Sequence, residues 1–334
     1  MAEHLTVAQL DERALLERIF PRLGAADVPV GPGDDAAVIE APDGRTVISI
    51  DTLVQDQDFR LEWASGYQSS GFDVGWKCAA QNVSDINAMG AVPTSLVISL
   101  TLPADTPVRW VEDMADGLRT ALHELGAERC AVVGGDLGRG AVLVVTAAVT
   151  GDLQGRAPVL RSGARPGDLV AVGGSLGRAA AGLALLEGTS GYGGMPPELQ
   201  ALAAAQSRPL PPLALGPRAA RAGAHAMMDI SDGLIRDAGR LARASGASLA
   251  LDYQRLDLFE VPLRQAARML DADPRHWVLG GGEDHGLLAV FPPGAGLPEG
   301  FVHIGSVVEA AAGAAEVTVD GEVPDVLGWD HFMG

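Results

Sequence analysis

The stretch "GWKCAAQNVSDINAMGA", residues 75–91, places polar side chains at helical spacing within an otherwise small and apolar run. Gln81, Asn82 and Asp85 fall in one stripe of a predicted helix, because residues three and four apart share a helix face. Lys77, the only lysine of the chain, lies four residues before Gln81, and we interpret it as a solvated side chain. The stretch therefore predicts a helix that presents a carboxylate and amides on one face.

Strands and helices are predicted on both sides of this helix. The first half shows helices over 7–23, 70–90 and 106–125 and strands over 36–40, 46–54, 95–102, 130–135 and 141–149. The second half shows strands over 168–173, 224–230, 248–252 and 286–291 and helices over 175–187 and 233–245. We therefore predict two domains, residues 1–152 and 153–334, the first α+β and the second α/β.

Composition excludes several classes of protein. The 334 residues carry a formal net charge of −19, which disfavours nucleic acid, because phosphate backbones are bound by clustered Lys and Arg. The chain has no "GxxxxGK[ST]" phosphate loop, and its longest apolar run is too short to cross a bilayer. The N-terminus lacks the features of a signal peptide, and two cysteines give no disulfide framework. We therefore expect a soluble, cytoplasmic protein that binds neither nucleic acid nor membrane.

Carboxylates recur beside small residues at predicted strand ends and helix edges. They are Asp34 and Asp35 in "GPGDDAA", Asp51 in "ISIDTLV", Asp85, Asp136 in "VVGGDLGRG", Asp229 and Asp232 in "MMDISDGL", and Glu283 and Asp284 in "GGGEDHG". Any one of them is open to a local interpretation, in which Asp232 caps the helix beginning at Gly233. Together with Ser and Thr they form hard oxygen ligands suited to Mg²⁺. The neighbouring glycines would let backbone N–H groups approach a polyphosphate, held by bridging metal ions.

The set resembles a known family. "GPGDDAAV", "GWKCAAQNVSDINAMGA", "GGDLGRG", "LRSGARPGD", "MDISDGL", "GGEDH" and "GWDHF" resemble, in this order, the thiamine-monophosphate kinases of the AIR-synthase-like (PurM-like) ATP-binding superfamily. The resemblance spans residues 31–332. It implies a two-domain fold with an N-terminal α+β domain that forms a homodimer and a C-terminal α/β domain, and ATP in the cleft between them. It also implies that ATP phosphorylates thiamine phosphate to thiamine diphosphate with several Mg²⁺ ions.

The resemblance assigns roles to individual residues. It implies metal ligands at Asp35, Asp51, Asp85, Asp136, Asp229 and Asp232, assisted by Ser49 and Ile50. It implies ATP contacts at Gly135, Asp136, Arg161 and Ser231 and thiamine phosphate contacts at Asp58, Glu283 and Trp329. We assign no catalytic base, because the acceptor phosphate is already ionised near neutral pH.

The chain departs from the family at three places. Asp58 replaces a usual His, Leu137 and Gly138 replace hydroxyl residues, and His285 and Gly286 replace Tyr-Glu. These departures leave open a non-catalytic nucleotide-binding or Mg²⁺-binding regulator. Other superfamily members are AIR synthase, selenophosphate synthetase and the hydrogenase-maturation carbamoyl dehydratase. The last two rely on a cysteine or selenocysteine in a terminal segment, whereas Cys78 and Cys130 are interior.

Overall fold

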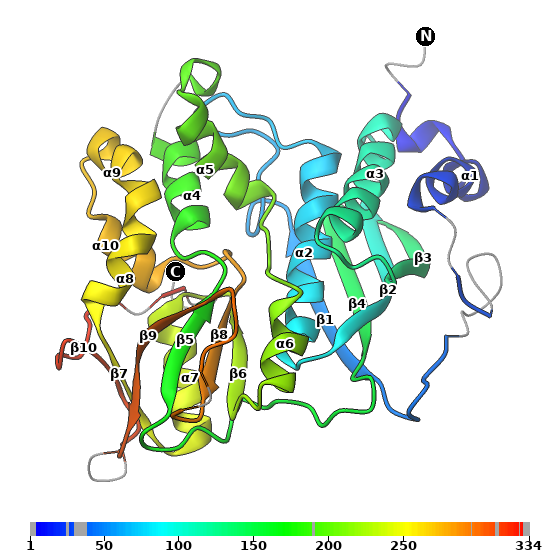
Figure 1. Cartoon of the computed structure of the whole chain (residues 1–334). Helices are drawn as coiled ribbons and strands as arrows, with labels where there is room; N and C mark the ends of the chain where they lie inside the picture. The colour runs from blue at the N-terminus through cyan, green and yellow to red at the C-terminus, as the bar shows by residue number, and fades with distance from the viewer. Residues whose placement is uncertain are drawn as a thin grey trace. The chain divides into compact units, whose positions relative to one another are not determined.

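The computed structural model describes residues 5–24, 27–29, 39–188, 191–294, 296–310, 314–326 and 328–329 (Figure 1). The chain divides into two compact units, each described by itself. The N-terminal unit comprises Met1–Trp63, Tyr67–Ile86 and Val92–Gly155, and the C-terminal unit comprises Ala64–Gly66, Asn87–Ala91 and Arg156–Gly334. In the part that the structure describes, no helix is long and apolar enough to span a membrane.

The N-terminal unit is built on a four-stranded sheet of order β1-β4-β2-β3. Its strands are β1 (Val47–Val54), β2 (Val92–Leu102), β3 (Ala131–Arg139) and β4 (Val144–Asp152), and only β2 and β3 pair in parallel. Its helices are η1 (Val7–Gln9), α1 (Glu12–Leu23), α2 (Gly71–Ala88) and α3 (Val108–Glu124). On β1, Leu53 is buried whereas Ile48 and Ile50 are 69% and 64% exposed, so one face of the sheet is covered and the other is open.

Helices α2 and α3 touch through glycines. A Cβ on Gly75 would meet the carbonyl oxygen of Met114 at 2.1 Å, and one on Gly117 would meet that of Phe72 at 2.1 Å. Larger residues at these positions would separate the two backbones. Gly75 of the opening stretch therefore serves close helix packing, and Val111, Met114 and Leu118 of α3 are buried at helical spacing.

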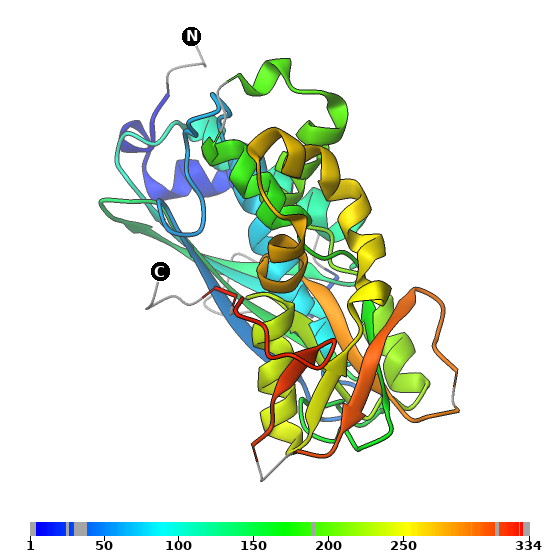
Figure 2. The ribbon, with the colours of Figure 1, turned by 90° about the vertical axis from the view of Figure 1, so that its left-hand side faces the viewer.

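The C-terminal unit contains a six-stranded sheet of order β10-β7-β9-β5-β8-β6 (Figures 1 and 2). The strands are β5 (Leu169–Gly173), β6 (Ala226–Ile230), β7 (Ser248–Leu251), β8 (Gly286–Phe291), β9 (Phe301–Val308) and β10 (Val317–Val319). The helices are α4 (Arg178–Gly188), η2 (Tyr192–Gly194), α5 (Pro197–Ser207), α6 (Leu215–Arg221), α7 (Leu234–Ser245), α8 (Tyr253–Glu260), η3 (Val261–Leu263), α9 (Arg264–Leu270) and α10 (Pro274–Gly280).

Both faces of this sheet are covered. Met228 and Leu288 belong to one buried cluster with residues of α7, whereas Met227 and Leu287 belong to another with residues of α6. Because neighbouring residues of a strand point to opposite faces, the two clusters lie on opposite sides of the sheet. Strands β6 and β8 are buried at every position, and apart from Asp229 and Gly286 their residues are apolar.

One predicted element needs correction, and another is largely untested. The helix predicted over 7–23 begins at Glu12, because Leu10 is extended and the Asp11 carboxylate caps α1 through the N–H of Ala14 at 2.7 Å. Thr6 and Gln9 do form a capping box, but it caps only the short η1. Most of the strand predicted over 36–40 lies outside the described residues.

Candidate functional site

Strand β1 and helix α2 bring together three of the predicted metal ligands. The Ser49 hydroxyl donates a hydrogen bond to the Asp85 carboxylate at 2.5 Å. Asp51 follows two residues after Ser49 on the same face of β1, and burial together with its charge raises the pKa of the Cys78 thiol on α2 to about 12. Oxygen donors of this kind suit Mg²⁺. Asp51 pairs with Ala147 inside β1, so the expectation that it lies at the strand's end was wrong.

The predicted ligand Asp136 lies elsewhere on the sheet. It is exposed and pairs with Ser99 of β2. Asp51 pairs with Ala147, and across β2 this row of paired residues ends at Gly135, the residue before Asp136. Because the side chains of adjacent rows point to opposite faces of a sheet, Asp51 and Asp136 lie on different faces. Gly135 packs closely against the backbone of β2, since a Cβ there would meet the Ile98 carbonyl oxygen at 2.2 Å. Ile50, also predicted to assist a metal, is on the open face.

Asp58, in the turn after β1, is in contact with Lys77 of α2. The Asp58 carboxylate accepts a hydrogen bond from the Val54 N–H at 2.7 Å, and the Lys77 ammonium donates to the Asp58 carbonyl at 2.7 Å. Lys77 is 2% exposed, so the interpretation of a solvated lysine was wrong. Its long side chain instead fastens the turn that carries Asp58 to α2.

In the C-terminal unit, backbone contacts link four predicted residues at the end of β6. The Glu283 N–H donates to the Ser231 carbonyl at 2.8 Å, and the Trp329 N–H donates to the Asp232 carbonyl at 2.8 Å. A Cβ on Gly282 would meet the Ser231 carbonyl oxygen at 2.5 Å, so this close approach requires glycine. The "MDISDGL" and "GGED" segments are therefore one structural site, as is the start of "GWDHF".

The carboxylates of this site are partly neutralised by residues that sequence reasoning missed. Arg240 forms ion pairs at 2.6 Å with both Asp232 and the fully buried Asp237. The interpretation of Asp232 as a helix cap was wrong, because Gly233 is the N-cap of α7 and no side chain caps it. Asp229 is buried, and its carboxylate lies 3.5 Å from Nδ1 of His285. The i,i+3 spacing of Asp237 and Arg240 could have indicated their pair.

The two acids of "GGED" have different surroundings. Asp284 is buried and accepts hydrogen bonds from the Ser175 hydroxyl and the N–H groups of Arg178 and Ala179, which fixes the start of α4. Burial raises the pKa of Asp284 to about 6, against the lowering effect of these hydrogen bonds. Glu283 is half-buried, and its carboxylate accepts a hydrogen bond from Gln206 at 3.0 Å.

The remaining predicted residues are Arg161 and Asp35. The side chain of Arg161 is exposed, and its carbonyl accepts a hydrogen bond from Ser245. Asp35 lies outside the described residues. Within the described ranges, no three His, Cys, Asp or Glu side chains are grouped to hold a metal ion. The fit to Mg²⁺ thus rests on smaller sets of oxygen donors, such as the pair of Ser49 and Asp85. Burial, and to a smaller extent the charges of Asp229 and Asp232, raises the pKa of Asp237 to about 6.

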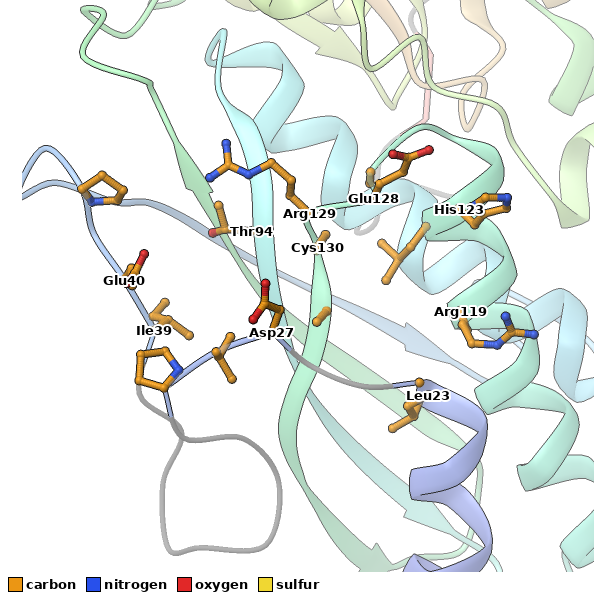
Figure 3. A pocket seen from close by; sticks show the side chains of 17 residues that line it. Leu23, Asp27, Ile39, Glu40, Thr94, Arg119, His123, Glu128, Arg129 and Cys130 are labelled. Carbon is orange, nitrogen blue, oxygen red and sulfur yellow. The ribbon is translucent and has the colours of Figure 1, made fainter.

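A pocket of about 650 Å³ lies within the N-terminal unit (Figure 3). Its described lining includes Arg119 and His123 of α3 and Arg129 just before β3. None of the predicted site residues is among them. The pocket is therefore separate from the groups described above.

Comparisons with known proteins bear on the whole chain. Residues 33–153 match the family model "AIR synthase related protein, N-terminal domain", and residues 165–322 match the model of its C-terminal domain. The thiamine-monophosphate kinase of Mycobacterium tuberculosis is 44% identical over 99% of this chain and 94% of the relative, and that of Corynebacterium glutamicum is 38% identical over 98% and 95%. The solved structure of AaThiL complexed with AMPPCP and TMP is 31% identical, with a TM-score of 0.76 over 98% of this chain and 99% of its own. The thiamine monophosphate kinase of Aquifex aeolicus is 30% identical, with a TM-score of 0.74 over 96% of this chain and 99% of its own.

The two matched domains show that the chain is an AIR-synthase-related protein, as the set of motifs predicted. Within that class the relatives and the solved structure agree on one activity. The chain belongs to the thiamine-monophosphate kinase family.

Proposed function

We propose that this protein transfers the γ-phosphoryl group of ATP to thiamine phosphate, giving thiamine diphosphate and ADP. The observation that carries the proposal is the linkage of Ser231, Asp232, Glu283 and Trp329 through backbone hydrogen bonds in the C-terminal unit. These are residues to which the resemblance assigns ATP, metal and thiamine phosphate contacts. The AaThiL complex with AMPPCP and TMP supports the same pair of substrates.

The proposed mechanism needs no catalytic base. The second pKa of a phosphate monoester is about 6, so the acceptor oxygen is already ionised at neutral pH. The protein must hold two anions in line and offset their repulsion, which is positioning and electrostatic stabilisation. We assign Gly135, Arg161 and Ser231 to the phosphates of ATP, and Asp58, Glu283 and Trp329 to thiamine phosphate.

We further propose that Mg²⁺ is required. The ions would be held by Ser49, Asp51, Asp85 and Asp136 of the N-terminal unit, by Asp229 and Asp232 of the C-terminal unit, and by Asp35. Ile50 would assist only through its backbone carbonyl, since its side chain lies on the open face. When bound, the ions supply positive charge that neutralises the phosphates and the developing charge on transfer. Arg240 offsets part of the negative charge at Asp232 and holds that carboxylate in place.

We also propose a cytoplasmic homodimer, with residues 1–152 as the dimerisation domain and 153–334 as the second domain. Ile50 of β1 and Val97 of β2 both pair with Ala148 of β4, so these two exposed side chains point to the open face of the sheet. Ile48, two residues before Ile50, is exposed on the same face. An apolar sheet face of this kind is suited to a self-complementary, two-fold contact. Cys78 and Cys130 are unpaired and buried, which suits a reducing compartment.

The proposal is tested by incubating the purified protein with ATP, Mg²⁺ and thiamine phosphate and separating the products. We expect thiamine diphosphate and ADP in equal amounts, and no product when Mg²⁺ is chelated. Bound ATP without any diphosphate product would instead support the regulator. Asp136→Asn and Asp85→Asn should each abolish turnover and weaken Mg²⁺-dependent ATP binding measured by calorimetry, and near-normal values would contradict the metal assignment.

A further inference from the structure

Gln206 is a buried amide directed at a residue of the proposed substrate site. It lies near the end of α5, is 4% exposed, and its Nε2 donates to Oε2 of Glu283 at 3.0 Å. Leu199, Leu202 and Ala203 of the same helix are buried in the core. An amide placed in such surroundings is costly unless it is hydrogen-bonded, so the contact with Glu283 compensates for its burial.

The main chain of Glu283 is held independently of this contact. Its φ of 65° lies in the left-handed region, which is unfavourable for a residue with a side chain. The hydrogen bond from its N–H to the Ser231 carbonyl, and the tight approach of Gly282 to the same oxygen, hold that conformation. The backbone of Glu283 is thus held by Ser231 at the end of β6, and its carboxylate is held by Gln206 of α5.

We propose that Gln206 is the positioning residue that sets the Glu283 carboxylate for a cationic acceptor substrate. The proposal rests on the function proposed above, in which the acceptor carries a positively charged thiazolium ring. A neutral donor orients the carboxylate while leaving its negative charge intact, whereas Arg or Lys in the same place would neutralise it. Gln206 thereby supports selection of a cationic ring beside the phosphate.

The test compares two substitutions of similar size. Gln206→Met removes the donor, and we expect the KM for thiamine phosphate to rise about tenfold while the KM for ATP stays within about twofold. Gln206→Glu places a like charge beside Glu283 and raises the pKa of the pair. Its KM for thiamine phosphate should therefore be highest at pH 8 and fall toward the wild-type value as the pH is lowered and one carboxyl becomes protonated.

Gln200 provides the matched control, because it lies on the same helix and its Nε2 donates to the Met195 carbonyl at 2.9 Å. Gln200→Met should leave both KM values unchanged. Equal rises in the two KM values, or the same rise in Gln200→Met, would overturn the role of Gln206. If the wild type shows no kinase activity, the proposed function fails. Calorimetric binding of thiamine phosphate to the wild type and to Gln206→Met then tests the inference alone, and equal affinities overturn it.

Discussion

The Asp237 carboxylate accepts a hydrogen bond from the backbone N–H of Asp232 at 2.9 Å, across the first turn of α7. Arg240 then joins the two side chains through ion pairs at 2.6 Å. Burial, reinforced by the charges of Asp229 and Asp232, raises the pKa of Asp237 to about 6. The predicted metal ligand Asp232 is therefore held by the Asp237 carboxylate through its backbone and by the Arg240 guanidinium through its side chain.

Arg240→Met should destabilise the protein, because it leaves the Asp237 charge buried without its partner. Breaking a fully buried pair costs ~3–5 kcal/mol. Arg240 is 34% exposed, so we expect a loss of about 2 kcal/mol in urea unfolding. The control is Arg264→Met, which breaks an ion pair with Asp257 whose side chains are 48% and 55% exposed and should cost less than ~1 kcal/mol. Equal losses in both variants would contradict this account.

Elements with a strong local signal could be predicted from the sequence. Val111, Met114 and Leu118 repeat at helical spacing and are all buried on α3. The apolar run before Asp229 forms the buried strand β6, as its length and composition indicate. The start of α1 also has a local cause, because the Asp11 carboxylate caps this helix through the N–H of Ala14.

The contacts that complete the site could not be predicted, because they join distant parts of the chain. Gln206 and Glu283 are 77 residues apart, and no local pattern connects them. Lys77 lies near polar residues on a helix, which favours a solvated side chain. It is buried because the turn ending at Asp58 offers it a carbonyl acceptor, and that turn is positioned by tertiary structure.

Gly233→Ala should destabilise the protein and lower its activity. Gly233 has a φ of 116°, and a Cβ there would meet the Gly280 carbonyl oxygen at 2.6 Å, so the substitution adds both strain and a backbone clash. We expect a loss of at least ~3 kcal/mol by urea unfolding. Gly246→Ala is the matched control, since Gly246 has a φ of 65° and open space around it, and should cost about 1 kcal/mol. A Gly233→Ala protein as stable as the control would show that the clash relaxes freely.

Ile50→Asp should convert the proposed dimer to monomers. The substitution places a charge in the middle of the open face of the N-terminal sheet, where Ile50 is 64% exposed and would be buried by a second copy. Sedimentation velocity should show a single dimeric species for the wild type and a monomer for the variant, with unchanged circular dichroism. Leu210→Asp, at a residue 65% exposed in the C-terminal unit, should stay dimeric. A monomeric wild type, or a dimeric Ile50→Asp, would exclude this face as the interface.

Asp284 should give the stability of the protein a pH dependence of defined sign. Its pKa is raised from 3.8 to about 6, chiefly by burial, so between these values the folded state binds a proton that the unfolded state has released. Unfolding free energy therefore decreases as the pH rises from about 4 to about 6, by up to about 3 kcal/mol, and this term is constant above that window.

Asp284→Asn removes this titration while keeping a side chain that accepts a hydrogen bond. Measured by urea unfolding between pH 4 and 7, the stability of the wild type relative to the variant should fall with increasing pH and then level off near pH 6. Asp257→Asn changes an exposed carboxylate instead and should retain the pH dependence of the wild type. A difference between wild type and Asp284→Asn that is flat or rises over this range would mean that the buried carboxyl is already ionised in the folded protein, with Ser175 and the first N–H groups of α4 offsetting its burial.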